Sequence, residues 1–259
     1  MTIAAEILPL ETEKVSVAYA LDRGSARYRI GLIALSTDEA TEYDFHRMLP
    51  AEEVMFFTSR VITVNPVTME NLRSMGPRLA AAAGQILPDQ GLDVIAYSCT
   101  SGTVAMGYDG VAAQIREGRP GVPVVTPITA AVKGFRKLGI DRISLLTPYI
   151  DSVNQPMRHF LEDQGIAVAN IGSFCLENDV DMARLPPEAI RAAALETYRA
   201  DAQALFISCT AIRAAEVVAD LEAELGVPVL SSIQCLFWDA LRQTGYSAPL
   251  EGHGSLTRL

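Results

Sequence analysis

Short runs of apolar residues recur along the chain, and amphipathic stretches with helical spacing separate them. Most of these runs lack the alternation of a strand with one wet face, so they predict strands buried on both faces. Strands of this kind that alternate with helices are typical of a parallel sheet covered by helices on both sides. The predicted strands lie at residues 29–36, 61–64, 93–98, 122–125, 142–147, 166–170, 204–208 and 227–230, with helices at 69–87, 153–164, 187–199 and 213–225.

The second half of the chain repeats the order of short motifs found in the first half. YSCT at 97–100 is followed by GVPV at 121–124, and ISCT at 207–210 is followed by GVPV at 226–229. RIGLI at the first predicted strand likewise matches RISLL at the fifth, and the ending RKLG at 136–139 matches RQTG at 242–245. Matches that keep one order through both halves indicate an internal repeat, and they predict two similar α/β units.

The repeat predicts two flavodoxin-like subdomains, each a doubly wound parallel sheet, in a pseudo-twofold arrangement. We expect the first subdomain to comprise residues 27–126 and 228–259, with the final strand and helix completing it, and the second to comprise residues 127–227. Residues 1–26 are expected to form an N-terminal tail, or an arm that contacts a partner. Open parallel sheets bind ligands at the carboxyl ends of their strands. The active site is therefore expected between the two subdomains.

Composition and charge exclude several classes of function. The chain has 49% hydrophobic and 20% charged residues, which predicts a globular core and not a disordered protein. Its 21 basic and 31 acidic residues give a net charge of −10, which argues against nucleic-acid binding. Apolar runs stay well short of the roughly 18 residues that span a bilayer, and the first residues lack the basic start of a signal peptide. We expect a cytoplasmic homo-oligomer without membrane contact.

The four cysteines are the main candidates for chemistry. Cys99, Cys175, Cys209 and Cys235 form no CxxC pair and are distant in sequence from the three histidines, so we expect neither a zinc site nor a disulfide scaffold. Cys99 and Cys209 occupy matched positions of the repeat, each between a predicted strand and a predicted helix start, where free N–H groups bind carboxylates and lower a thiol's pKa. We interpret Cys175 and Cys235 as structural residues.

Two thiols that face each other across an anion-binding cleft have few chemical uses. One can act as a thiolate base and the other as an acid on opposite faces of a carbon α to a carboxylate, which is racemisation. Alternatively, one adds to an activated double bond while the other handles the proton, which gives cis–trans isomerisation. Both reactions require an enediolate stabilised by N–H groups and hydroxyls. Neither requires a metal ion or an organic cofactor.

These motifs resemble one branch of the Asp/Glu racemase superfamily, the branch with maleate cis–trans isomerase and arylmalonate decarboxylase. The stretch ALSTDEATE at 34–42 is also similar to ectoine-utilisation proteins grouped with that branch. The resemblance runs from about Arg29 to Gly245. It implies that Cys99 is the nucleophile and Cys209 the second cysteine of a cofactor-independent isomerase with a small carboxylate substrate. It further implies that the substrate's carboxylates are bound by Thr100, Ser101, Tyr149, Asn178 and Thr210.

Two departures from the family pattern bear on the substrate. The decarboxylase has a glycine where this chain has Cys99, which disfavours simple decarboxylation. Maleate isomerases have an asparagine where this chain has Asp38, and a carboxylate there would repel a dianion such as maleate. Asp38 would instead suit a substrate with an amine, such as a diaminobutyrate derivative, and we predict that it lies in the cleft. The alternative is that Asp38 only caps a helix.

Weaker signals point to other classes of site. The glycines between Gly102 and Gly110 mimic a phosphate-binding loop, but their spacing is wrong and no lysine completes it. Glu177, Asp179 and Asp181 could suggest a metal site, although a solvated loop or helix start explains them as well. The sequence therefore predicts a maleate-isomerase-like enzyme, with an amino-acid racemase, a decarboxylase-like enzyme and a non-catalytic catabolite-binding protein as alternatives.

Overall fold

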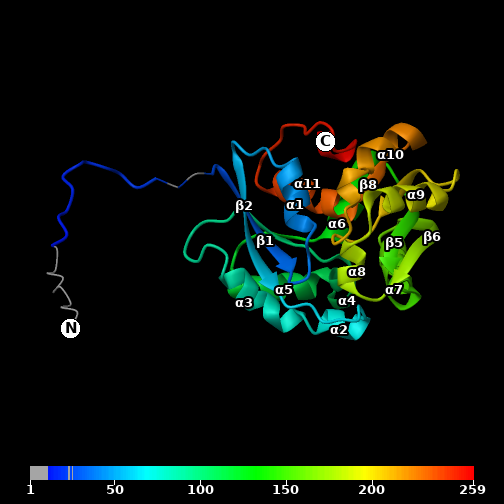
Figure 1. Ribbon diagram of the computed structural model, residues 1–259, viewed down its shortest axis with the longest axis horizontal. Coiled ribbons are helices and arrows are strands. Elements are labelled where there is room, and N and C mark those ends of the chain that lie inside the picture. Colours follow the sequence, from blue (N-terminus) through cyan, green and yellow to red (C-terminus); the bar gives the residue numbers. More distant parts are fainter. Residues whose placement is uncertain (1–10, 23, 25) are drawn as a thin grey trace, which may run out of the picture.

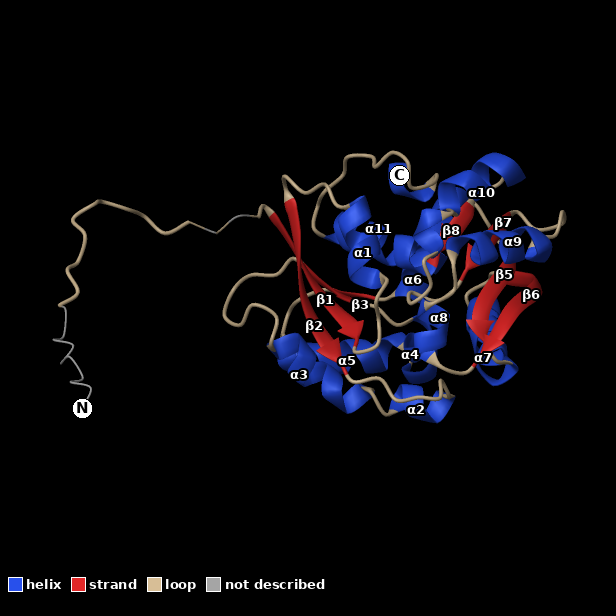
Figure 2. Ribbon diagram, viewed as in Figure 1, coloured by secondary structure: helices blue, strands red, loops and turns tan. Residues whose placement is uncertain are grey.

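The strands form two four-stranded sheets in which all pairs are parallel. A computed structural model describes residues 11–22, 24 and 26–259. The sheet orders are β2-β1-β3-β4 and β6-β5-β7-β8. Each sheet therefore places its four strands in the same sequence order, which confirms the two similar α/β halves. The strands are drawn red in Figure 2. The strands are β1 (Tyr28–Leu35), β2 (Val54–Val61), β3 (Val94–Tyr97), β4 (Val124–Val125), β5 (Arg142–Tyr149), β6 (Ala167–Leu176), β7 (Ala204–Ile207) and β8 (Val229–Ser231).

Several helices begin or end at residues that act as caps. α11 begins with a capping box, in which Ser231 and Gln234 each bond the other's backbone N–H, and α6 ends at Gly139 in the left-handed conformation that favours glycine. The helices are α1 (Thr41–Met48), α2 (Met69–Arg73), α3 (Leu79–Gly84), α4 (Thr100–Met106), α5 (Tyr108–Gly118), α6 (Pro127–Leu138), α7 (Asp151–Asp163), α8 (Asp179–Ala183), α9 (Pro187–Thr197), α10 (Val218–Leu225) and α11 (Ser232–Gln243), with 3₁₀ turns η1 (Gly76–Arg78), η2 (Ala214–Glu216) and η3 (Leu256–Arg258).

The two halves exchange a helix. α6 follows β4 of the first sheet but packs on the second, where Phe135 meets Phe206 of β7 edge to face at 5.4 Å. Gly134 lets α6 approach β8, because a Cβ there would lie 3.1 Å from the Leu230 side chain. In return α11, which follows β8, packs its buried face on the first sheet together with α1. A 2.6 Å ion pair between Lys133 and Asp239 joins the two exchanged helices.

This exchange corrects one part of the predicted organisation. The final strand was expected to complete the first subdomain, but β8 pairs with β7 in the second sheet. The repeat explains this, because the second GVPV motif leads into β8 just as the first leads into β4. The final helix, α11, does pack on the first sheet. The division of the chain into subdomains at residues 126 and 228 otherwise stays a prediction.

Two predicted elements differ for local reasons. The strand expected at 61–64 is β2, Val54–Val61, an edge strand whose mixture of apolar and polar residues hides its periodicity. The single helix expected at 69–87 is instead α2, η1 and α3. The break lies at Gly76-Pro77, because proline has no N–H for a helical hydrogen bond and its ring crowds the preceding turn.

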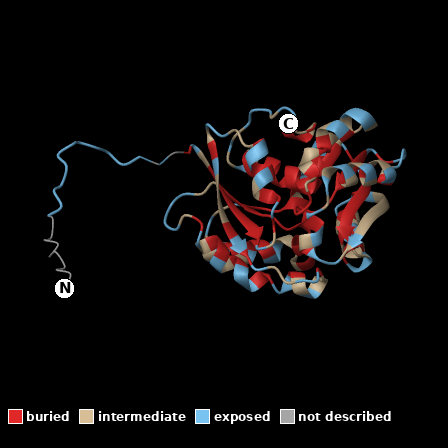
Figure 3. Ribbon diagram, in the orientation of Figure 1, coloured by how far each residue is buried: buried red, intermediate tan, exposed pale blue. Residues whose placement is uncertain are grey.

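The buried strands and inward helix faces form the core between these layers, whereas residues 11–22 lie outside it (Figures 1 and 3). Residues 11–22 are exposed and lack regular secondary structure, as expected for a tail, and residues 1–10, 23 and 25 of the predicted tail lie outside the described residues. Of the helices in the described part of the chain, none is long and apolar enough to cross a membrane.

Candidate active site

The carboxyl ends of strands from both sheets meet where the two halves touch. Cys99 follows β3 by two residues and Cys209 follows β7 by two residues, so the thiols stand at equivalent places in the two sheets. The Thr210 hydroxyl donates a 3.1 Å hydrogen bond to the Ser98 carbonyl, which ties the two strand ends together. We call this contact region the seam and define it by Thr37, Asp38, residues 98–101, Tyr149, Asp179, Cys209 and Thr210.

Cys99 is the N-cap residue of α4, and only 3% of the residue is exposed. Its sulfur accepts a hydrogen bond from the Gly102 N–H at 3.2 Å and lies 3.9 Å from the Ser101 hydroxyl. The Tyr97 hydroxyl lies against the same sulfur. Burial nevertheless outweighs these donors and raises the pKa of Cys99 to about 11. The expectation that a helix start would lower this pKa is therefore wrong for the closed seam.

Cys209 stands in a strained turn and not at the start of a helix. Its φ is +106°, in a region that residues other than glycine rarely adopt, and such strain costs about 1–3 kcal/mol and is concentrated at functional sites. The next regular element is η2 at Ala214, so the predicted helix start after Cys209 is wrong. The Cys209 N–H donates to the Ser232 hydroxyl at 3.1 Å, and its sulfur accepts from the Ala211 N–H at 3.4 Å. Burial raises the pKa of this thiol as well.

Tyr149 connects the two thiols. It is the last residue of β5 and is 2% exposed. Its hydroxyl interacts with the Cys209 thiol and with the Ser101 side chain, which is itself beside Cys99. Burial raises the pKa of the Tyr149 hydroxyl, so it remains a hydrogen-bond donor at neutral pH. Tyr149, Ser101 and both cysteines therefore form one buried polar group.

The remaining predicted carboxylate ligands lie at different depths. Thr100 is 1% exposed, and its hydroxyl meets no hydrogen-bond partner among the described residues. Thr210 is also buried, but its hydroxyl is engaged by Ser98. Asn178 is exposed at the start of α8, with its amide 3.5 Å from the Asp181 carboxylate. The structure brings the two threonines to the thiols and leaves Asn178 on the outside, and whether each binds a substrate stays a prediction.

Asp179, one residue after Asn178, is an acidic residue of the seam in addition to Asp38. The sequence suggested a metal site, a solvated loop or a helix start for it. It is 5% exposed, its carboxylate accepts from the Thr37 hydroxyl, and its N–H donates to the Asn65 side chain at 3.0 Å. Its charge raises the pKa of both Cys99 and Cys209. Its position could have identified it from the sequence, because it comes shortly after the carboxyl end of β6, where open parallel sheets bind ligands.

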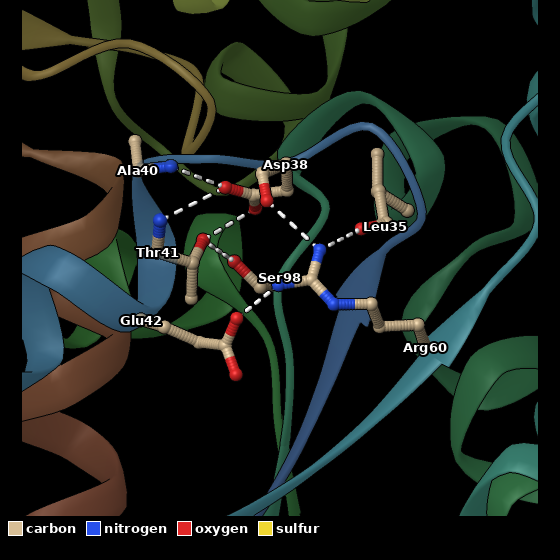
Figure 4. A network of polar contacts seen from close by, with 7 residues as sticks. All are labelled: Leu35, Asp38, Ala40, Thr41, Glu42, Arg60 and Ser98. Carbon is tan, nitrogen blue, oxygen red and sulfur yellow. Dashed lines mark hydrogen bonds and ion pairs between the residues drawn. The ribbon is translucent and has the colours of Figure 1, made fainter.

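Asp38 caps the chain entering α1 (Figure 4). One carboxylate oxygen accepts from the N–H groups of Ala40 and Thr41 at 2.9 and 2.8 Å, and the other accepts from the Thr41 hydroxyl at 2.5 Å. The Thr41 hydroxyl also meets the Ser98 hydroxyl at 2.7 Å, next to Cys99. Burial raises the pKa of Asp38, and the charge of Asp179 raises it further. Asp38 thus borders the seam as a helix cap, and contact with a substrate stays a prediction.

A cavity of about 560 Å³ opens beside the seam, between α1 and α8. Arg184 and Arg213 line it together with Glu39 and Tyr43. In the chain, Arg184 comes shortly after Asp179, Arg213 after Cys209, and Glu39 and Tyr43 after Asp38. Its lining therefore comes from both halves. In the described part of the chain no three His, Cys, Asp or Glu side chains are grouped so as to hold a metal ion.

Known proteins with the same fold include two kinds of enzyme. The arylmalonate decarboxylase of Bordetella bronchiseptica is 32% identical over 139 residues, which cover 52% of this chain and 58% of that protein. The maleate isomerase of Nocardia farcinica is 27% identical over 241 residues, which cover 89% of this chain and 95% of the relative.

The solved structures agree with the sequence relatives. A mutant of the Nocardia farcinica maleate cis–trans isomerase with a covalently bound succinylcysteine intermediate matches with a TM-score of 0.81 at 24% identity, covering 89% of this chain and 98% of that one. The family model described as arylmalonate decarboxylase matches residues 30–257, nearly the whole described body. The chain therefore belongs to the arylmalonate decarboxylase family, in the branch of the Asp/Glu racemase superfamily that also contains the maleate isomerases.

Proposed function

We propose that the protein is a cofactor-independent isomerase that acts α to a carboxylate of a small acid, with Cys99 and Cys209 as its catalytic pair. The observation that carries this proposal is the buried group in which Tyr149 and Ser101 connect two thiols at equivalent strand ends. The similarity to a maleate isomerase, which extends over almost the whole chain, supports cis–trans isomerisation as the reaction. The ALSTDEATE stretch leads us to place the substrate in ectoine catabolism.

The two thiols suit different roles. Cys99 has a backbone N–H and two hydroxyls around its sulfur, and its pKa is raised less than that of Cys209. Cys99 is therefore the better thiolate and Cys209 the better proton donor. Because both thiols are protonated in the closed seam at neutral pH, a base or a change of charge on substrate binding has to release the Cys99 proton.

In cis–trans isomerisation the Cys99 thiolate adds to one carbon of the substrate's double bond. The π electron pair moves onto the neighbouring carboxylate as an enediolate, and the former double bond rotates as a single bond. The electron pair then returns, re-forms the double bond and expels the thiolate. No atom is gained or lost, and the family relative from Nocardia farcinica with its bound succinylcysteine supports a cysteine adduct of this kind.

The enediolate needs donors that are in place before the reaction. Thr100 has a buried hydroxyl without a partner among the described residues, and Tyr149 keeps its proton. Donors fixed in a dry site are worth more than donors in water, because the protein does not have to reorganise as charge develops. We assign these two hydroxyls to the substrate carboxylate next to the reacting carbon.

Amino-acid racemisation is the second candidate, and the acidic residues of the seam favour it. Asp38 and Asp179 are both buried in the seam, and the charge of Asp179 acts on both thiols. Such negative charges would repel a second carboxylate and attract an ammonium group. In this reaction one thiolate removes the α-proton and the other thiol delivers a proton to the opposite face. The two thiols finish with exchanged protonation states.

The test is proton NMR of the pure protein in D₂O with maleate and a panel of amino acids. Isomerisation gives new olefinic signals, and racemisation removes α-proton signals. Cys99→Ser and Cys209→Ser should each lower the active reaction by at least about 100-fold. Cys175→Ser, an exposed thiol, should leave it unchanged. Full activity of the Cys209→Ser variant would contradict a catalytic pair of cysteines. Binding of an acid without any turnover would favour a catabolite-binding protein.

A further inference from the structure

Asp179 is held in place by contacts that cross between the two halves. It belongs to the second half, yet Thr37 of the first half donates to its carboxylate and Asn65 of the first half accepts its N–H at 3.0 Å. Two residues earlier, the Glu177 carbonyl accepts from the Val67 N–H at 2.7 Å. The carboxylate is therefore positioned by three bonds on one short segment, and it does not lie on a free loop.

The charge of this carboxylate is not balanced by the protein. Among the described residues, Asp179 takes part in no ion pair with a Lys, Arg or His. The titratable groups whose charges interact with it are Asp38, Cys99 and Cys209, all of which are neutral or negative. Burial also raises the pKa of Asp179 itself, so its carboxylate is stabilised either by taking up a proton or by a cation placed beside it.

A second feature points to a ligand at the same place. The Thr100 hydroxyl, next to Cys99, is buried without a partner among the described residues. The seam therefore offers a donor that suits a carboxylate, next to Cys99 in the chain, and an acceptor that suits a cation, whose charge acts on both thiols. A small acid that carries both charges would satisfy both groups at once.

We propose that Asp179 is the specificity-determining residue of the site and that it selects an acid with an ammonium group near the reacting carbon. The inference rests on the proposed function, because it concerns the substrate of the same two thiols. It differs from the prediction made for Asp38, whose carboxylate oxygens are occupied by the first turn of α1.

The same arrangement couples binding to reactivity. The negative charge of Asp179 raises the pKa of both thiols in the empty site. An ammonium group beside Asp179 neutralises that charge and so favours release of the Cys99 proton. A dianion leaves the charge in place and adds to it.

The first arm of the test needs no substrate. The rate at which iodoacetamide alkylates Cys99 is measured against pH by mass spectrometry in the wild type and in Asp179→Asn. Because only the thiolate reacts, loss of the carboxylate charge should raise the rate by about three- to tenfold at pH 8. Glu177→Gln removes an exposed charge two residues away and should change nothing. An unchanged profile for Asp179→Asn overturns the proposal.

The second arm compares two probes that differ in one ammonium group, aspartate and succinate, by isothermal titration calorimetry. The wild type should bind aspartate at least about tenfold more tightly, Asp179→Glu should keep that preference, and Asp179→Asn should lose it. Equal binding of the two acids by the wild type overturns the proposal even if Asp179→Asn fails to fold. Preferred binding of aspartate, together with no turnover of maleate or of any amino acid in the D₂O assay, contradicts the proposed function alone, so the two failures are distinct.

Discussion

The hydroxyl of Thr210 donates to the carbonyl of Ser98 at 3.1 Å, across 112 positions of sequence and from one sheet to the other. Ser98 precedes the first thiol and Thr210 follows the second. This one bond therefore connects the two cysteine-bearing strand ends directly. Because each half contributes one thiol, a bond between the two halves at this point helps to fix how the thiols lie relative to each other.

We predict that Thr210→Val lowers both stability and activity. Valine keeps the shape of the side chain but leaves the buried Ser98 carbonyl without this donor, which should cost about 1–3 kcal/mol of unfolding free energy. Turnover should fall by at least about tenfold, because small displacements of reacting groups are expensive. Thr244→Val is the control, since that hydroxyl donates to the Leu241 carbonyl at 2.8 Å away from the seam. Equal turnover by both variants would contradict the role assigned to Thr210.

A second prediction concerns the glycine in the first turn of α4. A Cβ added at Gly102 would lie 2.8 Å from the Cys99 sulfur and 2.7 Å from the Tyr97 hydroxyl, both buried. Gly102→Ala should therefore destabilise the protein by about 1–3 kcal/mol through overpacking, and it should displace the thiol and abolish turnover.

The control for Gly102 is Gly110→Ala on the next helix. There the nearest atom to an added Cβ is 3.9 Å away, so alanine should stabilise α5 by about 0.5–1 kcal/mol. Chemical denaturation measures both variants. A stabilised and active Gly102→Ala protein would show that the thiol does not need the space which glycine leaves.

The sequence predicted the repeat and the equivalent placement of Cys99 and Cys209. Buried parallel strands are visible in a sequence as apolar runs, and each cysteine directly follows such a run. The sequence did not predict the turn at Cys209. Nothing in Thr210-Ala-Ile-Arg213 forbids a helix. Cys209 has a positive φ in the turn and contacts Ser232 and Tyr149, which lie far away in the chain.

Which residue of the 178–179 pair lies in the seam also depends on packing that the local sequence does not show. Asn178 and Asp179 are neighbours, and only the docking of α8 against Asn65 and Thr37 turns the aspartate inward. The lowered thiol pKa expected from sequence was also wrong for this reason. A helix start stabilises a thiolate, but complete desolvation outweighs it, and desolvation is a property of the packed seam.

Asp44 supports a prediction about pH. It is fully buried on α1, and neither carboxylate oxygen meets a hydrogen-bond partner among the described residues. Burial, with a smaller effect from the Glu216 charge, raises its pKa from 3.8 to about 7. The folded state thus binds this proton more tightly than the unfolded state. The resulting stabilisation is complete below about pH 4 and is lost as the pH rises to about 7.

Asp44→Asn should therefore stabilise the protein above pH 7 by about 2–4 kcal/mol and have little effect near pH 4. Urea unfolding at pH 4.5 and pH 8 measures the difference. Asp141→Asn, an exposed aspartate before β5, should show no such dependence on pH. A gain of the same size at both pH values would mean that the asparagine acts by packing, and the charge would then have no part in it.

Asp38→Asn separates a helix cap from a substrate ligand. The sequence predicts that this change shifts preference from an amine-bearing acid toward a dianion. The structure supports a different expectation, because both Asp38 oxygens already accept hydrogen bonds from Ala40 and Thr41 at the start of α1. Asparagine keeps the oxygen that accepts the two N–H groups and replaces the oxygen that meets the Thr41 hydroxyl. It should therefore cost about 1 kcal/mol or less of unfolding free energy.

The ratio of aspartate to succinate affinity should change by less than about threefold in Asp38→Asn, against a loss of about tenfold for Asp179→Asn. Calorimetry on both variants in one buffer makes the comparison. If Asp38→Asn reduces the ratio as strongly as Asp179→Asn does, the ammonium group reaches Asp38, and the two carboxylates then bind it together.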